Sequence, residues 1–447
     1  MFKKILIANR GEIAVRIIRS AKELGIKTVA IYSEADKESL HVRLADEAVC
    51  VGSTYATNSY LKIPNIIAAA EITEADAIHP GYGFLSENEE FASICESHGI
   101  VFIGPTAECI HKMGDKVTAR KTAEKFGVPV TPGTKDLVQT EEEAVEMAGK
   151  IGYPVMLKAS SGGGGKGMRV ANNEEEVRAN LKICKNEAMA NFGNDDMYIE
   201  KYILNPKHIE IQVIGDKYGN AIHLGERDCS IQRRNQKMIE EAPSIILDSD
   251  LRNKMGESAV RITKGIHYDS VGTFEFLVDQ HKNYYFMEMN TRVQVEHTVT
   301  ELVTGIDIIK TQIMIAAGER LSVRQSEVKL SGHAIECRIN AEDPSMNFMP
   351  SAGLITHYIP SGGLGVRIDS HIFSGYEISP YYDSMIGKLI VYGADREEAI
   401  ERMKRALDEH IIEGVKVTTP FLRKIMDDED YIAGKVYTNF IDLFMKK

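Results

Sequence analysis

Along residues 288–296, polar and less polar side chains alternate at every step. The polar positions carry two carboxylates, two amides and a guanidinium: Glu288, Asn290, Arg292, Gln294 and Glu296. Because successive side chains of a strand point to opposite faces, this pattern predicts an extended segment with one polar face. A solvated strand face would also be polar, so the pattern alone does not establish a functional site.

Two β-rich runs next to this segment predict a hairpin. Residues 272–279 and 284–290 flank a short polar turn, as hairpin strands do. Pairing Asp279 with Tyr284 fixes the register between them. The register matters because it decides which polar side chains face each other.

This register places Glu275 directly opposite Glu288, where two carboxylates repel each other. A cation between them would remove the repulsion. Oxygen ligands from Glu275, Glu288 and Asn290 suit a hard ion such as Mg²⁺. The alternatives are a solvated acidic pair or a register shifted by one residue.

The first hundred residues alternate strand and helix patterns. Residues 3–8 and 27–32 are predicted strands, and 12–24 between them has helical apolar spacing. This βαβ unit begins a doubly wound segment that runs to about residue 104. Its first turn lacks G-x-G-x-x-G, so a dinucleotide site is not supported. The Gly-rich loop 79–87 follows a strand and is either a ligand-binding loop or a simple turn.

A helix carrying Lys116 is predicted over residues 106–127. A lone helical lysine is usually a solvated charge. After a Pro- and Gly-rich boundary, residues 131–203 are predicted to form a small α+β insert. Its first helix falls near 140–150 and its first strand at 153–159.

The loop 160–168 of the insert has five glycines within six residues. It is not a dinucleotide-binding turn, because the strand-like sequence MRVA follows it. It is not a Walker A loop either, because Lys166 is followed by Gly167. A glycine loop between two strands can wrap a phosphate with backbone N–H groups as a mobile flap, and Lys158 adds positive charge. A flexible hairpin tip is the alternative.

Further strand patterns follow the insert. Residues 197–201 are predicted to leave it as a strand, and the next strand alternates three polar residues with apolar ones: His208, Glu210 and Gln212. Cations concentrate in 226–237, which favours a small-anion site over a solvated loop. A helix is predicted over 304–318.

The chain starts a new unit near residue 330. One polar strand face carries Glu336, Arg338 and Asn340, strands and turns follow, and a capped helix is predicted near 396–408.

Composition limits the classes of function. The chain has 447 residues, which predicts two to four domains. It has 53 basic and 65 acidic residues and a net charge of −12, which argues against binding nucleic acid or an anionic membrane. Six scattered cysteines without a C-x-x-C pair indicate a reducing compartment. Without a signal peptide or a membrane-length apolar run, we expect a cytoplasmic protein.

Six motifs together resemble biotin carboxylase, an ATP-grasp enzyme, over essentially the whole chain. They are NRGEIAVRIIR, HPGYGFLSEN, KASSGGGGKGMRV, ERDCSIQRR, EMNTRVQVEHTVTE and YYDSMIGKLI. The resemblance implies an α/β and α+β multidomain protein with an ATP-grasp fold. A doubly wound βαβ domain (1–114) would precede the ATP-grasp domain (115–330), whose lid is 131–203. A mixed α/β C-terminal domain (331–447) would follow.

The resemblance also implies roles for individual residues. Residues that match the family's ATP site are Lys116, Lys158, Gly164, Gly165, Glu200, Lys201, Ile203, His208, Asn235, Glu275 and Glu288. About two Mg²⁺ or Mn²⁺ ions would be held by Glu275, Glu288 and Asn290. Bicarbonate would be bound by Lys237, Arg292, Gln294 and Val295. Glu296 matches the general base, Arg338 the group that stabilises the biotin enolate, and Tyr82 a biotin contact. Asn235 departs from the family pattern, which has histidine there.

The implied reaction is the ATP- and bicarbonate-dependent carboxylation of biotin through carboxyphosphate. It would be the first half-reaction of acetyl-CoA carboxylase, leading to malonyl-CoA and fatty acid synthesis. Because the chain stops at Lys447 and lacks the A-M-K-M biotin motif, a separate biotin carboxyl carrier protein and carboxyltransferase subunits are the expected partners. A homodimer is expected through the surface near Leu364 and Arg367. The alternatives are another ATP-grasp ligase and a non-catalytic nucleotide-binding subunit.

Overall fold

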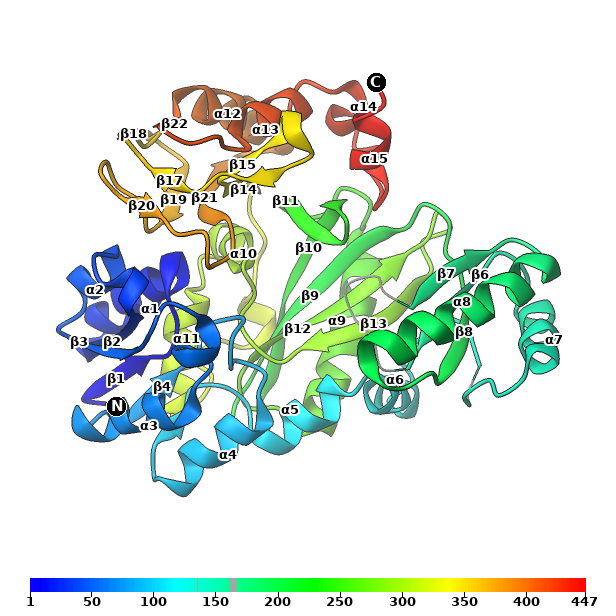
Figure 1. The fold of residues 1–447 in the computed structure, drawn as a ribbon, viewed down its shortest axis with the longest axis horizontal. Helices are drawn as coiled ribbons and strands as arrows, with labels where there is room; N and C mark the ends of the chain where they lie inside the picture. The colour runs from blue at the N-terminus through cyan, green and yellow to red at the C-terminus, as the bar shows by residue number, and fades with distance from the viewer. Residues whose placement is uncertain (135, 161–166) are drawn as a thin grey trace.

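The computed structural model describes residues 1–134, 136–160 and 167–447. Figure 1 shows the N-terminal segment, the insert and the C-terminal segment grouped around a central sheet. That sheet has eight antiparallel strands in the order β13-β12-β9-β10-β11-β14-β21-β19. They are β9 (Lys207–Gly215), β10 (Ala221–Arg233), β11 (Gln236–Ala242), β12 (Val271–Val278), β13 (Tyr284–Asn290), β14 (His333–Asn340), β19 (Val366–Ser370) and β21 (Met385–Gly393).

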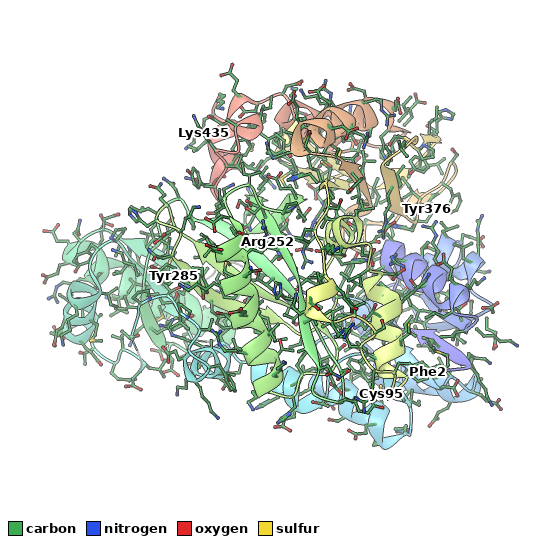
Figure 2. The ribbon with its side chains drawn as sticks, turned by 180° about the vertical axis from the view of Figure 1, so that it is seen from behind. Phe2, Cys95, Arg252, Tyr285, Tyr376 and Lys435 are labelled. Atoms are coloured by element: carbon green, nitrogen blue, oxygen red, sulfur yellow. The ribbon has the colours of Figure 1, made fainter. Side chains whose placement is uncertain are left out.

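The two faces of the central sheet differ because its strands alternate apolar and polar residues. The apolar face is covered by α9 (Ser249–Gly265) and α12 (Arg396–Glu409), whose buried side chains pack on those of β9, β12 and β14. Seen from behind, α9 lies across the sheet with Arg252 labelled (Figure 2). The polar face is therefore left to line the site described below.

The N-terminal segment is a parallel five-stranded sheet in the order β3-β2-β1-β4-β5. Its elements are β1 (Lys4–Ile7), α1 (Gly11–Glu23), β2 (Lys27–Ser33), α2 (Leu40–Leu44), β3 (Glu47–Gly52), α3 (Ile63–Ile72), β4 (Ala77–His79), α4 (Glu89–Ser97) and β5 (Val101–Phe102). The loops after β1 and β4 meet where the strand order reverses, and the Asn9 amide donates to the carbonyls of Pro80 and Tyr82 at 2.7 and 2.8 Å. Such a switch point is where α/β sheets present ligand-binding loops.

The insert has a three-stranded sheet in the order β7-β6-β8. Its elements are α7 (Glu141–Ile151), β6 (Val155–Ala159), β7 (Met168–Ala171), α8 (Glu174–Phe192) and β8 (Met197–Lys201). The strand predicted at 197–201 is confirmed as β8. The predicted phosphate-binding glycines Gly164 and Gly165 lie outside the described residues, so the glycine flap stays a prediction.

The central sheet does not end where the sequence predicts a new unit near residue 330. Strand β14 pairs with β11, so the C-terminal segment extends the same sheet. The predicted helix at 396–408 is α12. The other elements of this segment are β15 (Glu342–Asp343), β16 (Met349–Pro350), β17 (Gly353–Leu354), β18 (His357–Ile359), β20 (Glu377–Ile378), β22 (Ile411–Glu413), α13 (Thr419–Ile425), α14 (Glu429–Ile432) and α15 (Phe440–Phe444).

Two predicted helices differ in extent from the observed ones. The helix expected over 106–127 is α5 (Ala107–Gly114) and α6 (Lys116–Lys125), because the Asp115 carboxylate caps α6 by accepting from the Thr118 amide. The helix expected over 304–318 is α11 (Ile308–Ala316). It is preceded by α10 (His297–Thr304), a helix that was not predicted from the sequence. Gly305 ends α10 with φ +71°, a conformation that glycine adopts without strain.

All six cysteines are free, and all but Cys50 are buried. The reducing compartment stays a prediction. Among the described residues, none of the helices combines the length and the apolar character that a membrane span requires.

A buried ion-pair cluster lies on the apolar face of β11. The Glu241 carboxylate is 2.8 Å from His333 Nε2 and 2.7 Å from Arg396 Nε. Burial alone would raise the Glu241 pKa, but these partners outweigh it and lower the pKa to about 2. This carboxylate therefore stabilises the fold fully above its ordinary pKa of 4.5, and the contribution is lost as the pH falls toward 2.

We expect Glu241→Gln to lower the free energy of unfolding at pH 7 by about 2–4 kcal/mol, because it leaves the Arg396 guanidinium and the buried His333 ring without their anionic partner. The deficit should shrink as the pH falls from 4.5 toward 2, since the wild-type carboxylate then loses its charge as well. Urea unfolding at a series of pH values measures both effects. A deficit that stays constant across this range would contradict the ion-pair account.

Candidate active site

A row of charged residues crosses four neighbouring strands on the polar face of the central sheet. Glu288 on β13 is opposite Glu275 on β12, Glu275 is opposite Glu210 on β9, and Glu210 is opposite Arg227 on β10. Glu288 and Glu275 line a cavity of about 1730 Å³, whereas Glu210 and Arg227 are fully buried. Two carboxylates therefore face the cavity, and a third carboxylate and a guanidinium continue the same row in the protein interior.

The predicted opposition of Glu275 and Glu288 is confirmed, but the predicted pairing at the turn is wrong. Tyr284 pairs with Val278 instead of Asp279. A β-bulge at Met287 inserts one extra residue into β13 and shifts the register back. The two carboxylates face each other because the bulge compensates for the offset at the turn.

The prediction of a continuous strand over 288–296 is wrong beyond Asn290, where β13 ends. A turn follows, and α10 begins at His297. The turn nevertheless brings the polar side chains of this segment to one place, since all five line the cavity together with Val295: Glu288, Asn290, Arg292, Gln294 and Glu296.

Lys237 on β11 joins three carboxylates. Its Nζ lies 2.6 Å from Glu210, 2.9 Å from Glu275 and 2.6 Å from Glu296. Burial would lower the Lys237 pKa, but the three carboxylates raise it well above its ordinary value. Lys237 is therefore a fixed cation at the centre of the site.

Glu296 links Lys237 to Arg338 on β14. Its second oxygen lies 3.0 Å from Arg338 Nη2, and Arg338 also contacts Glu240 at 2.5 Å. Burial would raise the Glu296 pKa, but Lys237, Arg338 and Arg227 hold it well below its usual range. Glu296 is thus ionised and has the charge state that a proton acceptor needs. Burial also raises the pKa of Glu240, to about 7, despite Arg338.

The opposed carboxylates fit a divalent cation. Burial and the nearby Glu275 charge raise the Glu288 pKa, and Lys116 offsets this only in part. A cation between Glu288 and Glu275 would relieve that repulsion, and the Asn290 side-chain oxygen adds a third hard ligand. The Asn290 oxygen accepts from Arg292 at 2.9 Å, and the Asn290 amide donates to Glu275 at 2.9 Å.

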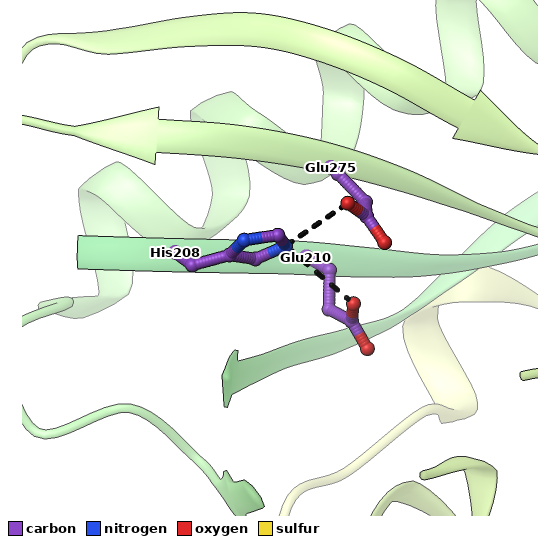
Figure 3. Close-up of side chains that lie close together, drawn as sticks. All are labelled: His208, Glu210 and Glu275. Carbon is purple, nitrogen blue, oxygen red and sulfur yellow. Dashed lines mark ion pairs between the residues drawn. The ribbon is translucent and has the colours of Figure 1, made fainter. Parts of the chain in front are cut away.

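A second acidic cluster, His208, Glu210 and Glu275, is drawn in Figure 3. Both of its carboxylates already have ion-pair partners. Glu210 binds Arg227 at 2.5 Å and Lys237 at 2.6 Å, and His208 Nε2 lies 3.1 Å from Glu275. Glu275 belongs to both sets, so what favours the set of Glu275, Glu288 and Asn290 is the repulsion between the opposed carboxylates, which adds to the effect of burial in raising the Glu288 pKa.

Arg292 is held by Glu87, a residue that no sequence pattern marked as part of the site. Glu87, from the Gly-rich loop after β4, accepts from Arg292 Nε at 2.8 Å and from the Thr291 amide at 2.9 Å. The partners are 205 residues apart in the chain. The only feature of the sequence that suggested a function for this loop was its position after a strand. That feature did not indicate that Glu87 would pair with Arg292. Glu210 and Arg227 were missed as well, although the alternation along β9 includes Glu210.

The other end of the cavity carries the residues predicted for nucleotide binding. Glu200 is paired with Lys158 at 2.6 Å and with Arg120 at 2.7 Å, and Lys201 donates to two backbone carbonyls. Of the predicted ATP-site residues, those that line the cavity are Lys116, Lys158, Glu200, Lys201, Ile203, His208, Asn235, Glu275 and Glu288. Tyr82 is not among the lining residues, and its hydroxyl donates to Glu12.

The predicted anion-binding cluster at 226–237 is divided by the fold. Its residues form the end of β10 and the start of β11, joined by Arg234 and Asn235 with φ of +51° and +63°. Asparagine tolerates this left-handed conformation, which gives Asn235 a backbone role in the turn. Arg227 is buried, and Arg233 donates to the Asn347 carbonyl at 2.9 Å. Lys237 and Arg234 reach the cavity.

This fold and site define an ATP-dependent ligase of the ATP-grasp class. Three family models cover the chain. "Biotin carboxylase, N-terminal domain" matches residues 1–110, "Carbamoyl-phosphate synthase L chain, ATP binding domain" matches 115–324, and "Biotin carboxylase C-terminal domain" matches 336–443. The chain belongs to the biotin carboxylase family.

Relatives and solved structures agree over nearly the full length. Biotin carboxylase of Nostoc is 59% identical over 98% of both chains, and biotin carboxylase 1 of Bacillus subtilis is 57% identical over 99% of both. The Campylobacter jejuni biotin carboxylase complex has a TM-score of 0.95 and 53% identity, over 99% of both chains.

Two relatives carry other names. A pyruvate carboxylase subunit of Methanothermobacter thermautotrophicus is 53% identical over 100% of this chain and 91% of its own. The 2-oxoglutarate carboxylase small subunit of Hydrogenobacter thermophilus is 53% identical over 99% and 93%. A solved biotin carboxylase domain dimer of that enzyme, described with MgADP and bicarbonate, has a TM-score of 0.94 and 53% identity, over 99% of this chain and 97% of its own. The final acceptor of the carboxyl group thus differs among the relatives.

Proposed function

We propose that this chain is the biotin carboxylase subunit of acetyl-CoA carboxylase and supplies the carboxyl group for malonyl-CoA and fatty acid synthesis. The observation that carries its carboxylase role is the joining of Lys237, Glu296 and Arg338 within 3.0 Å in one cavity. One proton acceptor is thereby placed between two fixed cations. The relatives from Bacillus subtilis and Nostoc, at 57% and 59% identity, are both called biotin carboxylase.

In the proposed reaction, bicarbonate is held by Lys237, Arg292, Gln294 and Val295. Lys237 exchanges one of its carboxylate partners for the substrate, and Glu296 accepts the bicarbonate proton. The freed oxygen attacks the γ-phosphoryl group of ATP to give carboxyphosphate and ADP. Carboxyphosphate breaks down to CO₂ and phosphate, and phosphate takes the ureido proton of biotin. Arg338 then stabilises the biotin oxyanion while it attacks CO₂.

Nucleotide binding is assigned to the opposite end of the cavity. Lys116, Lys158, Lys201 and His208 would contact ATP there, with Ile203 beside the base. Glu275, Glu288 and Asn290 would hold Mg²⁺ or Mn²⁺, in about two ions as the resemblance implies. When bound, the metal neutralises phosphate charge during transfer.

The proposed partners are a biotin carboxyl carrier protein, carboxyltransferase subunits and a second copy of this chain. The solved dimer of the 2-oxoglutarate carboxylase domain supports the homodimer. Of the two residues named for that surface, Leu364 is 90% exposed, whereas Arg367 is mostly buried and ion-paired with Glu301 and Asp369, each at 2.7 Å.

The test is ATP hydrolysis by the purified protein with Mg²⁺, with and without bicarbonate, then with free biotin. We expect hydrolysis that requires bicarbonate and rises with biotin. Hydrolysis indifferent to both would indicate another ATP-grasp ligase, and ATP binding without hydrolysis would indicate a non-catalytic subunit.

A second experiment identifies which molecule finally receives the carboxyl group. It is needed because the pyruvate and 2-oxoglutarate carboxylase subunits are both 53% identical to this chain. The protein is mixed with its carrier and carboxyltransferase partners, and carboxyl transfer from labelled bicarbonate is measured to acetyl-CoA, pyruvate and 2-oxoglutarate. Transfer to acetyl-CoA alone supports the proposal. Transfer only to a keto acid would replace acetyl-CoA carboxylase with the corresponding enzyme.

A further inference from the structure

Lys388, in the motif YYDSMIGKLI, is a fully buried lysine that the proposed reaction leaves without a role. It lies on β21 directly opposite Arg338 on β14. Opposed residues in a sheet share a face, so Lys388 is on the same polar face as the active site. It does not line the cavity, because the turn after β13 covers it.

Lys388 binds that turn directly. Its Nζ donates to the Val295 carbonyl oxygen at 2.7 Å and lies 3.3 Å from Glu12 Oε1. The Val295 carbonyl belongs to the peptide group that joins Val295 to Glu296. One buried ammonium group therefore connects the C-terminal part of the sheet, the N-terminal α1 and the turn that carries the proton acceptor.

The surroundings keep Lys388 charged. Burial would lower its pKa, but Glu12, Glu336 and Asp369 raise it. Glu336 is fully buried and accepts from the Thr298 hydroxyl on α10. A charged donor makes a stronger hydrogen bond to a carbonyl than a neutral one, which suits a fixed support beneath the turn.

We propose that Lys388 is a positioning residue for bicarbonate activation, holding the Val295–Glu296 peptide so that the Glu296 carboxylate meets bicarbonate in the reactive geometry. This inference rests on the proposed function. It predicts a defect in the bicarbonate step alone, since Lys388 binds the turn and Glu12 and not the described residues assigned to the nucleotide. A purely structural role, as the partner of Glu12, predicts lower stability without a selective kinetic effect.

The test measures bicarbonate-dependent ATP hydrolysis without biotin in the full-length protein. Lys388→Met keeps the side-chain length and removes the donor. We expect its kcat/KM for bicarbonate to fall about 10- to 100-fold, because a misplaced Glu296 lowers kcat and a displaced Val295 raises the KM for bicarbonate. The KM for ATP should stay within about twofold of wild type. Lys207→Met is the matched control: Lys207 is also buried, but it pairs with Asp228 at 3.2 Å, away from the turn.

A double variant, Glu12→Gln with Lys388→Met, removes both charges together and carries the test if the single variant does not fold. Its KM for bicarbonate should remain raised, because the bond to Val295 is still missing. Recovery of wild-type kinetics in the double variant would overturn the positioning role. Equal increases in both KM values, or a shift of the same size in Lys207→Met, would also overturn it. If ATP hydrolysis by the wild-type protein did not depend on bicarbonate, the proposed function itself would be wrong, and the role of Lys388 would fall with it.

Discussion

Glu296→Gln is expected to lower kcat for bicarbonate-dependent ATP hydrolysis about 10²- to 10⁴-fold, the usual contribution of a positioned acid or base. Lys237 and Arg338 donate to different oxygens of the Glu296 carboxylate. The amide keeps an acceptor oxygen for one of them and turns its NH₂ group toward the other, and it cannot take the bicarbonate proton. Glu296 is not in direct contact with the described residues assigned to the nucleotide end, so the affinity for ATP should stay near the wild-type value. Steady-state kinetics and calorimetric titration with ATP measure the two quantities.

Glu241→Gln is the matched control for this experiment. Glu241 on β11 is similarly buried and ion-paired, but it faces the other side of the sheet. The Glu241→Gln variant should have a lower free energy of unfolding and an unchanged kcat for bicarbonate-dependent ATP hydrolysis. Parallel losses of ATP affinity and turnover in Glu296→Gln would refute the role of Glu296 as proton acceptor.

Glu288→Gln should have opposite effects on stability and on metal binding. Removing one of two opposed carboxylates relieves repulsion, so the protein without Mg²⁺ should gain about 0.2–1 kcal/mol in the free energy of unfolding. The same change removes a metal ligand. The Mg²⁺ concentration needed for half-maximal ATP hydrolysis should therefore rise about 10- to 100-fold. Thermal melting with and without Mg²⁺ and ATP, together with Mg²⁺ titrations of activity, tests both effects.

Glu342→Gln serves as the control for the metal site. Glu342 also lines the cavity, but it accepts from Asn340 and Ser384 and is opposite Pro350 rather than an acidic residue. The Mg²⁺ concentration for half-maximal ATP hydrolysis in Glu342→Gln should equal the wild-type value. An unchanged Mg²⁺ requirement in Glu288→Gln would place the cation elsewhere, and the cluster of His208, Glu210 and Glu275 would be the next candidate.

The sequence was sufficient where a property depends on local alternation. Strands β9 and β14 alternate polar and apolar residues, and both present their polar residues to the site and their apolar residues to the helices behind. The facing of Glu275 and Glu288 was also predicted, but the turn register behind that prediction was off by one residue. The bulge at Met287 restored it, and no pattern in the sequence indicated the bulge.

Contacts between distant segments were not predictable in this way. The partners of Lys237 come from β9, β12 and the turn before α10, and Glu87 reaches Arg292 from the N-terminal sheet. Such pairs depend on which strands become neighbours and on how loops pack. A polar face shows that side chains point one way, but it does not show which partner lies opposite.

By itself, therefore, the sequence determined the family, the strands with one polar face and the residue types available for binding phosphate, metal and bicarbonate, because these depend on local composition and side-chain alternation. Only the tertiary structure decided that β13 ends at Asn290, that Lys237 joins three carboxylates and that Lys388 supports the Val295–Glu296 peptide. The physical reason is that strand order, bulges and chain crossings are set by packing of the whole core, which brings together residues that are far apart in the chain.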